Sequence, residues 1–277
     1  QGAVALLGFA CDAGVARNHG RVGASAGPAA IRAALANIPV AAQQVLSDAG
    51  DITCDGDSLE AAQQNYAERI TALLNQGLLP IGLGGGHEIA YGSFCGLAAH
   101  VHDAQPRIGI INFDAHFDLR ADEHASSGTP FRQIAEDCAA RGWEFNYCCL
   151  GVSEFANTQA LFTRAKQLGV TWRLDDDMTV RQLPANLAIL QDFLARVDVV
   201  YFTLCLDVLH AAVVPAVSAP AARGVAVEVI EPLLDAICQS GKLKLFDIAE
   251  LNPRFDIDNQ SARVAARLVA RVAKQIS

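Results

Sequence analysis

Short apolar runs of strand length alternate with helical segments along this chain, and that alternation most constrains its fold. The most strand-like run is VDVVYFTLCLDVL, residues 197–209. Other expected strands are 3–9, 44–53, 78–83, 107–113, 147–152, 170–174 and 243–248. Expected helices begin near residues 25 and 88, follow the loop 121–134, and span 58–76, 158–168, 181–196, 226–239 and 260–275. This order predicts a three-layer α/β/α sandwich around a mostly parallel sheet.

The composition is that of a folded chain with a sizeable core. Of its 277 residues, 52% are hydrophobic and 18% charged, which argues against disorder. No linker or break in composition interrupts residues 1–277, so we expect a single domain. The net charge of −9 argues against nucleic acid or an acidic membrane surface as a partner. We expect a small-molecule substrate, no membrane partner, and assembly into a homo-oligomer.

The cysteines indicate a reducing compartment. All eight lack CxxC pairing and mostly lie in apolar surroundings, as expected for reduced thiols of a cytoplasmic protein. The sequence starts at Gln1 and its only methionine is Met178, so we expect the natural chain to begin upstream. A targeting segment there would lie outside this sequence.

A cluster of possible metal ligands follows the expected strand 107–113. Asp114, His116 and Asp118 alternate, so in an extended backbone they share one face. Two carboxylates and an imidazole crowded together favour a hard divalent metal ion, because they would otherwise repel or stay unpaired. The alternative is a polar strand exit in which Asp114 caps the next helix.

Other polar residues also follow expected strands. His87, Asp207 and Glu250 come after strands, and ligands bind at the carboxyl ends of parallel strands. Glycines 84–86 suggest a phosphate cradle only weakly, because neither GxGxxG nor GK[ST] is present. A tight turn that carries His87 into the cluster is the simpler interpretation. A buried core histidine, and a solvated loop for the basic residues 17–21, remain alternatives.

Four segments resemble the signature blocks of the ureohydrolases, the arginase and agmatinase superfamily. They are, in the family's order, GLGGGHE (82–88), NFDAHFD (112–118), TLCLDVLHAAVVPAVSAP (203–220) and FDIAELNP (246–253). Finer features resemble the formimidoylglutamase branch, which hydrolyses N-formimidoyl-L-glutamate to L-glutamate and formamide in histidine degradation. These are RNHGRVGASAGPAAIR (17–32), the GGGHE and DAHFDLR forms, SSGTPFR (126–132) and ANTQAL (156–161). The resemblance implies the arginase-like fold.

The resemblance also implies a site with two Mn²⁺ ions. One ion would be held by His87, Asp114 and Asp118, and the other by Asp114, His116 and Asp207. The family's second bridging aspartate corresponds to Cys205, a poorer ligand for Mn²⁺ than a carboxylate. Whether or not Cys205 ligates, we therefore expect the second ion, at His116 and Asp207, to be the weaker one. The alternative is that Cys205 binds a softer ion such as Zn²⁺ well.

Further roles are implied for residues around these ligands. Asp118 would orient the attacking hydroxide or take its proton, and Glu250 would hold the formimidoyl nitrogens. Arg120, with Arg17 and Asn18, would anchor the substrate's carboxylates. Where arginases and agmatinases carry a histidine before the loop glycine, this chain has Ser127. The rival functions are another amidine or guanidine hydrolase, such as an agmatinase-like enzyme, and a metal-poor, non-catalytic relative, which the cysteine replacement suggests.

Overall fold

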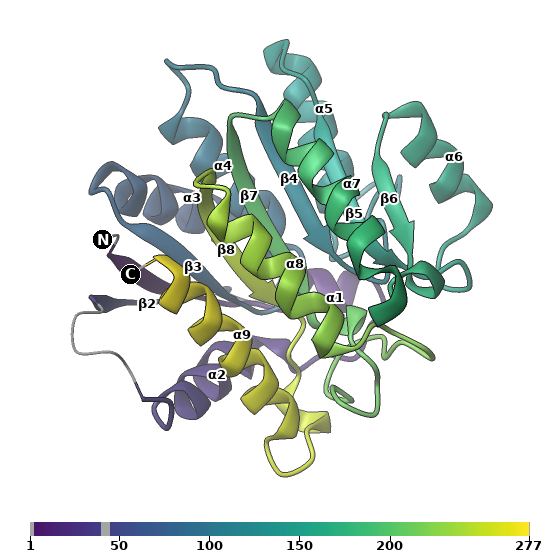
Figure 1. The fold of residues 1–277 in the computed structure, drawn as a ribbon. Helices are drawn as coiled ribbons and strands as arrows, with labels where there is room; N and C mark the ends of the chain where they lie inside the picture. Colours follow the sequence, from purple (N-terminus) through teal and green to yellow (C-terminus); the bar gives the residue numbers. More distant parts are fainter. Residues whose placement is uncertain (1–2, 40–44, 277) are drawn as a thin grey trace.

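One parallel sheet organises the computed structural model, which describes residues 3–39 and 45–276. Its strands are β1 (Val4–Ala10), β2 (Leu46–Thr53), β3 (Leu79–Gly84), β4 (Ile108–Phe113), β5 (Asn146–Val152), β6 (Thr171–Leu174), β7 (Val199–Cys205) and β8 (Leu243–Ala249). They lie in the order β2-β1-β3-β8-β7-β4-β5-β6, and within the described residues every neighbouring pair is parallel (Figure 1). The predicted sheet is therefore confirmed.

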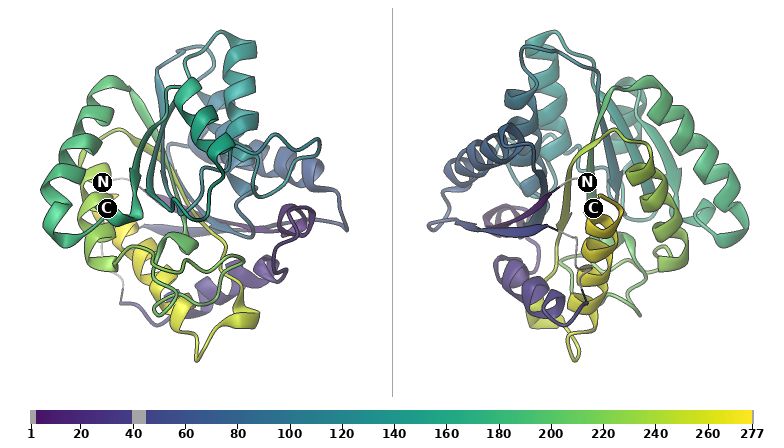
Figure 2. Two further views of the ribbon diagram at one scale, coloured as in Figure 1. Left: turned by 90° about the vertical axis from the view of Figure 1, so that its right-hand side faces the viewer. Right: turned by 60° about the vertical axis from the view of Figure 1, so that its left-hand side comes forward.

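Helices cover both faces of this sheet (Figure 2). One layer holds α2 (Gly27–Leu35), α7 (Leu183–Arg196), α8 (Val227–Gln239) and α9 (Gln260–Ile276). The opposite layer holds α3 (Leu59–Asn75), α4 (Ile89–His100), α5 (Pro130–Arg141) and α6 (Gln159–Gln167). The predicted three-layer sandwich is thus confirmed. Among the described residues, no helix combines the length and apolarity that crossing a bilayer requires.

Burial on both faces explains why the strands read as continuous apolar runs. In β7, Val200, Phe202 and Leu204 belong to the hydrophobic core under α7 and α8. Tyr201, between them, belongs to the core under α3 and α4. Successive strand side chains point to opposite faces, so a central strand needs apolar residues at nearly every position. Polar side chains within this strand therefore have a specific reason to be there.

Two details differ from the sequence-based expectations. The run 197–209 is a strand only to Cys205, and a 3₁₀ turn, Leu206–Val208, follows. At Cys205 the chain has reached the carboxyl ends of the strands, so it turns there although the following residues are still mostly apolar. The expected loop after β1 contains a short helix, α1 (Ala13–Arg17), which its glycines concealed. Residue 44 of the expected strand 44–53 lies outside the described residues.

Candidate metal centre

Four central strands of the sheet bring the candidate ligands together. β3, β8, β7 and β4 are spatial neighbours in that order, although they are far apart in the sequence. β3 leads through a glycine turn to His87, and β8 leads to Glu250. β7 ends at Cys205, and Asp114 directly follows β4. Because all carboxyl ends of a parallel sheet lie at one edge, these side chains meet there.

The glycine turn before His87 is shaped by close packing against the end of β1. The N–H of Gly85 donates to the carbonyl of Phe9, and that of Gly86 donates to the carbonyl of Cys11. A Cβ added at Gly85 would lie 2.0 Å from the Cys11 carbonyl oxygen, so a side chain cannot fit. Both N–H groups already have backbone partners, which leaves neither for a phosphate.

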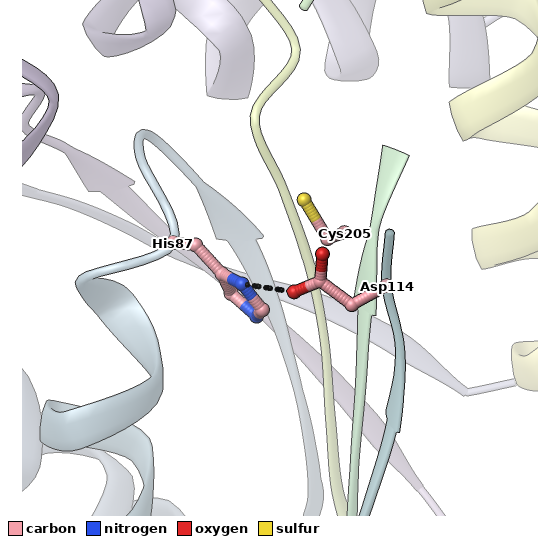
Figure 3. A group of neighbouring side chains, drawn as sticks. All are labelled: His87, Asp114 and Cys205. Carbon is pink, nitrogen blue, oxygen red and sulfur yellow. Dashed lines mark ion pairs between the residues drawn. The ribbon is translucent and has the colours of Figure 1, made fainter. Parts of the chain in front are cut away.

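His87, Asp114 and Cys205 form the first group that could hold a metal ion (Figure 3). One ligand atom from each lies within 4.8 Å of the other two. His87 Nδ1 lies 2.9 Å from Asp114 Oδ2 and also 2.9 Å from Asp118 Oδ2. The Nδ1 edge of the imidazole therefore faces the two carboxylates between which an ion would sit.

Asp114, His116 and Asp207 form the second group. His116 Nδ1 lies 3.1 Å from Asp207 Oδ2 and 3.5 Å from Asp114 Oδ1. Asp114 thus belongs to both groups, with Oδ2 toward His87 and Oδ1 toward His116. A carboxylate shared in this way is suited to bridging two divalent ions. The alternative that Asp114 caps a helix is wrong, because the next helix, α5, begins at Pro130.

Asp118 and Glu250 adopt unusual backbone conformations beside these groups. Their φ angles are +48° and +76°, in the left-handed region that non-glycine residues rarely occupy. Glu250 Oε1 accepts the backbone N–H of His87 at 2.9 Å. Its Oε2 is buried and has no hydrogen-bond partner within the described part of the chain. Strained backbone of this kind concentrates at functional sites, where it fixes a side chain's direction.

The electrostatics are those of a buried anionic cluster. Burial, reinforced by the charge of Asp114, raises the pKa of Asp118 to about 6. Burial and then the charge of Glu88 raise the pKa of Glu250 to about 8. Burial and the charge of Asp114 raise the pKa of the Cys205 thiol well above its usual value. Each shift reports that further negative charge is unfavourable here, so bound cations would relieve it.

The donor set fits a pair of divalent cations. Three carboxylates and two imidazoles converge with a single thiol, and carboxylates and imidazoles suit ions such as Mn²⁺. Cys205 is the one soft donor. Its sulfur lies within 4.8 Å of ligand atoms of His87 and Asp114, close enough to share an ion with them.

A cavity of about 260 Å³ opens above these ligands. Asn18 and Arg120 line it together with His87, His116, Asp118, Cys205, Asp207 and Glu250. The Asn18 side chain donates to Ser127 Oγ at 3.1 Å. No acidic side chain in residues 3–39 and 45–276 forms an ion pair with Arg120, so its guanidinium is available to an anion.

Arg17 occupies a different position from the one predicted. Its guanidinium lies 2.7 Å from Asp57 and 2.6 Å from Glu60, and it also donates to the carbonyl of Ala125. It is not among the residues lining the cavity above the ligands, but lines the neighbouring depression. The role of Arg17 as a carboxylate ligand stays a prediction, and this geometry argues against it because two acidic groups, from α3 and the segment before it, already neutralise the guanidinium.

Sequence reasoning missed several cavity residues. His19, Asn157, Leu161 and Ser218 line the cavity, yet no role was predicted for them. His19 has a φ of +58°, and the left-handed conformation could not be read from the sequence. The side chain of Asn157 bonds the backbone of Phe117 and Ala115, which fixes the ligand-bearing segment. The only signals were the position of His19 among basic residues and the segment 156–161.

Comparison with known proteins identifies the family. The sequence model that describes the arginase family matches residues 2–274 of this chain. The chain belongs to the arginase family. It is 63% identical to the formimidoylglutamase of Ralstonia nicotianae, over 100% of this chain and 86% of that protein. It is 58% identical to the formimidoylglutamase of Aeromonas salmonicida, over 98% of this chain and 86% of that protein.

Solved structures share the fold of this arginase-family chain. Formimidoylglutamase from Bacillus subtilis superposes with a TM-score of 0.86 at 24% identity, covering 99% of this chain and 88% of that one. A formiminoglutamase variant from Trypanosoma cruzi, solved with Mn²⁺, gives 0.87 at 25% identity, covering 99% and 93%. The family and the arginase-like fold predicted from the four sequence blocks are both confirmed.

Proposed function

We propose that this protein hydrolyses N-formimidoyl-L-glutamate to L-glutamate and formamide with the help of two Mn²⁺ ions. The observation that carries the proposal is the pair of donor groups that share the buried Asp114 beneath a cavity lined by Arg120, which forms no ion pair within the described residues. Relatives named formimidoylglutamase, 63% and 58% identical over nearly the whole chain, support the same reaction. A formiminoglutamase solved with Mn²⁺ supports the choice of metal.

The chemistry requires water to attack an amidine carbon. Mn²⁺, when held by His87, Asp114, His116, Asp118 and Asp207, would supply the Lewis acidity that makes water nucleophilic at neutral pH. The oxygen of that water adds to the formimidoyl carbon, and the bond from this carbon to the glutamate nitrogen breaks. The nitrogen of glutamate gains a proton as it leaves, and formamide remains.

Asp118 and Glu250 supply the groups that orient this reaction. Asp118 is positioned to hold the attacking water or to take its proton, and a pKa of about 6 places the carboxyl in a useful range. Glu250 lines the cavity, and its Oε2 has no hydrogen-bond partner among the residues that the structure describes. A cationic amidinium beside this carboxyl favours its ionised form, which accepts hydrogen bonds from the formimidoyl nitrogens.

The cavity wall suits an anionic substrate. Arg120 is exposed and unpaired among the described residues, so it can bind a carboxylate bidentately. Gly128 lies directly beneath it: an added Cβ there would meet Arg120 Cδ at 2.8 Å. The Asn18 amide lies close to the same glycine, so the two side chains can share one carboxylate. Agmatine would place its ammonium group near this guanidinium and lose the contact, whereas arginine offers only one carboxylate beside an ammonium group.

Product analysis tests the proposal most directly. The formimidoyl carbon has two C–N bonds, so hydrolysis can release either formamide or ammonia. Purified protein with added Mn²⁺ should form glutamate and formamide in equal amounts from N-formimidoyl-L-glutamate. Release of ammonia with N-formylglutamate, or equal activity on arginine and agmatine, would contradict the assignment. Protein stripped with EDTA is the matched control.

The setting of the reaction is also proposed. All eight cysteines are free thiols, which supports a reducing compartment such as the cytoplasm. A homo-oligomer of identical subunits is proposed, and light scattering on the purified protein tests it. The only partner required by the reaction is the small-molecule substrate.

A further inference from the structure

A buried hydroxyl and a buried carboxyl, those of Thr203 and Asp247, lie in a row behind the imidazole of His87. The Nδ1 edge of the ring faces Asp114 and Asp118, whereas Nε2 lies 3.1 Å from Thr203 Oγ1. Thr203 Oγ1 in turn lies 2.5 Å from Asp247 Oδ1. All members of this row are buried, so no bulk water competes for these contacts. The metal-binding, catalytic and substrate-binding roles assigned above do not use Thr203 or Asp247.

Asp247 is held from several sides. Ser93 Oγ donates to its Oδ2 at 2.6 Å, and the hydroxyl of Tyr201 donates to the same oxygen at 2.7 Å. No Lys or Arg of the described segments pairs with this carboxyl, so three hydroxyls are its partners. The absence of a side chain at Gly82 provides the space that Asp247 occupies, because a Cβ at residue 82 would lie 2.6 Å from the Cβ of Asp247.

The sheet register explains why this arrangement is rigid. Thr203 in β7 and Asp247 in β8 are direct partners across the two parallel strands. Their side chains lie on the face covered by α4, which contributes Ser93. Cys205 follows Thr203 by two residues and therefore lies on the same face. One strand thus supplies both a candidate ligand and the contact behind another ligand.

The direction of the protons follows from what each group can donate. A hydroxyl has one proton, and Thr203 gives it to Asp247, whose oxygens only accept when the carboxyl is ionised. Thr203 Oγ1 must then accept a hydrogen bond from His87, so Nε2 carries the ring proton. A neutral imidazole protonated at Nε2 has its lone pair at Nδ1, the atom that faces the two carboxylates.

We propose that Thr203 and Asp247 are positioning residues that fix His87 in the Nε2–H tautomer and thereby set the affinity for the metal ion bound at Nδ1. The proposal rests on the metal site assigned under the proposed function. Partners of this kind orient a ligating histidine, and their loss weakens metal binding about 10–100-fold. Phe131 restrains the same imidazole from another side, because the two rings pack edge to face with their centroids 5.4 Å apart.

Paired substitutions at Thr203 isolate the hydroxyl. Thr203→Val keeps the shape but leaves the buried Nε2–H without an acceptor, whereas Thr203→Ser keeps the acceptor. Thr203→Ala provides a second deletion in case the valine variant folds poorly. Asp247→Asn introduces an amide that can donate to Thr203 Oγ1, which would reverse the direction of the hydrogen bonds from Asp247 to His87. Thr71→Val is the matched control, because within the described chain that hydroxyl donates to the carbonyls of Ala67 and Gly96 and has no other partner.

Metal affinity is the primary measurement, made by following the EPR signal of free Mn²⁺ during titration of each purified protein. Thr203→Val, Thr203→Ala and Asp247→Asn should bind the ion about 10–100-fold more weakly than the wild type. Thr203→Ser should stay within a few-fold, and Thr71→Val should not change. A thermal unfolding scan of each variant separates loss of the ion from loss of the fold.

The outcomes separate this inference from the proposed function. If the wild type binds Mn²⁺ and His87→Ala loses it, while folded Thr203→Val and Thr203→Ala bind like wild type, the positioning role is refuted and the metal site stands. Failure of Thr203→Ser to restore the affinity would refute it as well. If the wild type itself binds no Mn²⁺, the proposed function fails first.

Discussion

Asp114 Oδ2 lies 2.9 Å from His87 Nδ1, although two whole strands, β8 and β7, separate the strands that carry these residues. The contact spans the middle of the sheet because both residues lie beyond the strand ends, where side chains can converge. Asp114 also reaches His116 through its other oxygen. The site therefore depends on one carboxylate more than on any other.

Replacing Asp114 should remove metal binding and hydrolysis together. Asp114→Ala deletes the only side chain that belongs to both donor groups, so neither ion keeps its shared ligand. His87→Ala and Asp118→Ala should each chiefly weaken one ion. Metal content measured by mass spectrometry, alongside formamide release, distinguishes these cases. Wild-type metal content in Asp114→Ala would mean that the centre has been assigned wrongly.

Arg120 should determine the preference for an anionic substrate. Arg120→Ala should raise KM for N-formimidoyl-L-glutamate about tenfold to a hundredfold, since one charge-assisted contact is worth about 1.5–3 kcal/mol. Arg17→Ala is the matched control: it removes an arginine already paired with Asp57 and Glu60, so KM should change little. Steady-state kinetics on both variants decide the matter. An equal rise in KM in both variants would show that Arg17 also binds the substrate.

Cys205 should limit how well two ions are held. Cys205→Asp supplies a second carboxylate beside His87 and Asp114, and should raise metal content toward two Mn²⁺ per chain and activity at low Mn²⁺. Equilibrium dialysis with Mn²⁺ and with Zn²⁺ gives the comparison. If the thiolate instead prefers the softer ion, the substitution should lower Zn²⁺ affinity. Tight binding of two Mn²⁺ by the wild type, unchanged in the variant, would exclude a limiting role.

Glu88 should make the protein less stable as pH rises. Its carboxyl is buried, Oε2 has no partner within residues 3–39 and 45–276, and burial raises the pKa from 4.5 to about 7. A raised native pKa means that the folded state binds the proton more tightly than the unfolded state. The resulting stability is complete below about pH 4.5 and is lost as pH rises through about 7.

Glu88→Gln tests this expectation because the amide keeps the shape without titrating. Over that pH interval the wild type should lose roughly 3 kcal/mol more of its free energy of unfolding than the variant, in urea titrations at both ends. The Gly14 N–H can still donate to the amide oxygen, as it does to Glu88 Oε1. Parallel pH dependence of the two proteins would show that Glu88 does not titrate in this range.

The sequence by itself determined the elements and the chemistry at their ends. Apolar runs and helical periodicity are local properties, so they located the eight strands of the described residues and most of the helices. The polar residues after β3, β4, β7 and β8 stood out because they interrupt apolar segments. Alternation of Asp114, His116 and Asp118 was enough to suggest a divalent cation. The four signature blocks indicated the family.

Only the tertiary structure decided which of these residues meet and through which atoms. Strand order depends on how the crossovers pack, and no local pattern reveals that β8 and β7 lie between β3 and β4. Arg17 and Arg120 looked alike in sequence, but of the two, within the described residues, Arg17 alone forms ion pairs, with Asp57 and Glu60. Thr203 and Asp247 read as ordinary strand residues until the register placed them side by side behind His87. A side chain's role is set by its partners across the sheet, and these are distant in sequence.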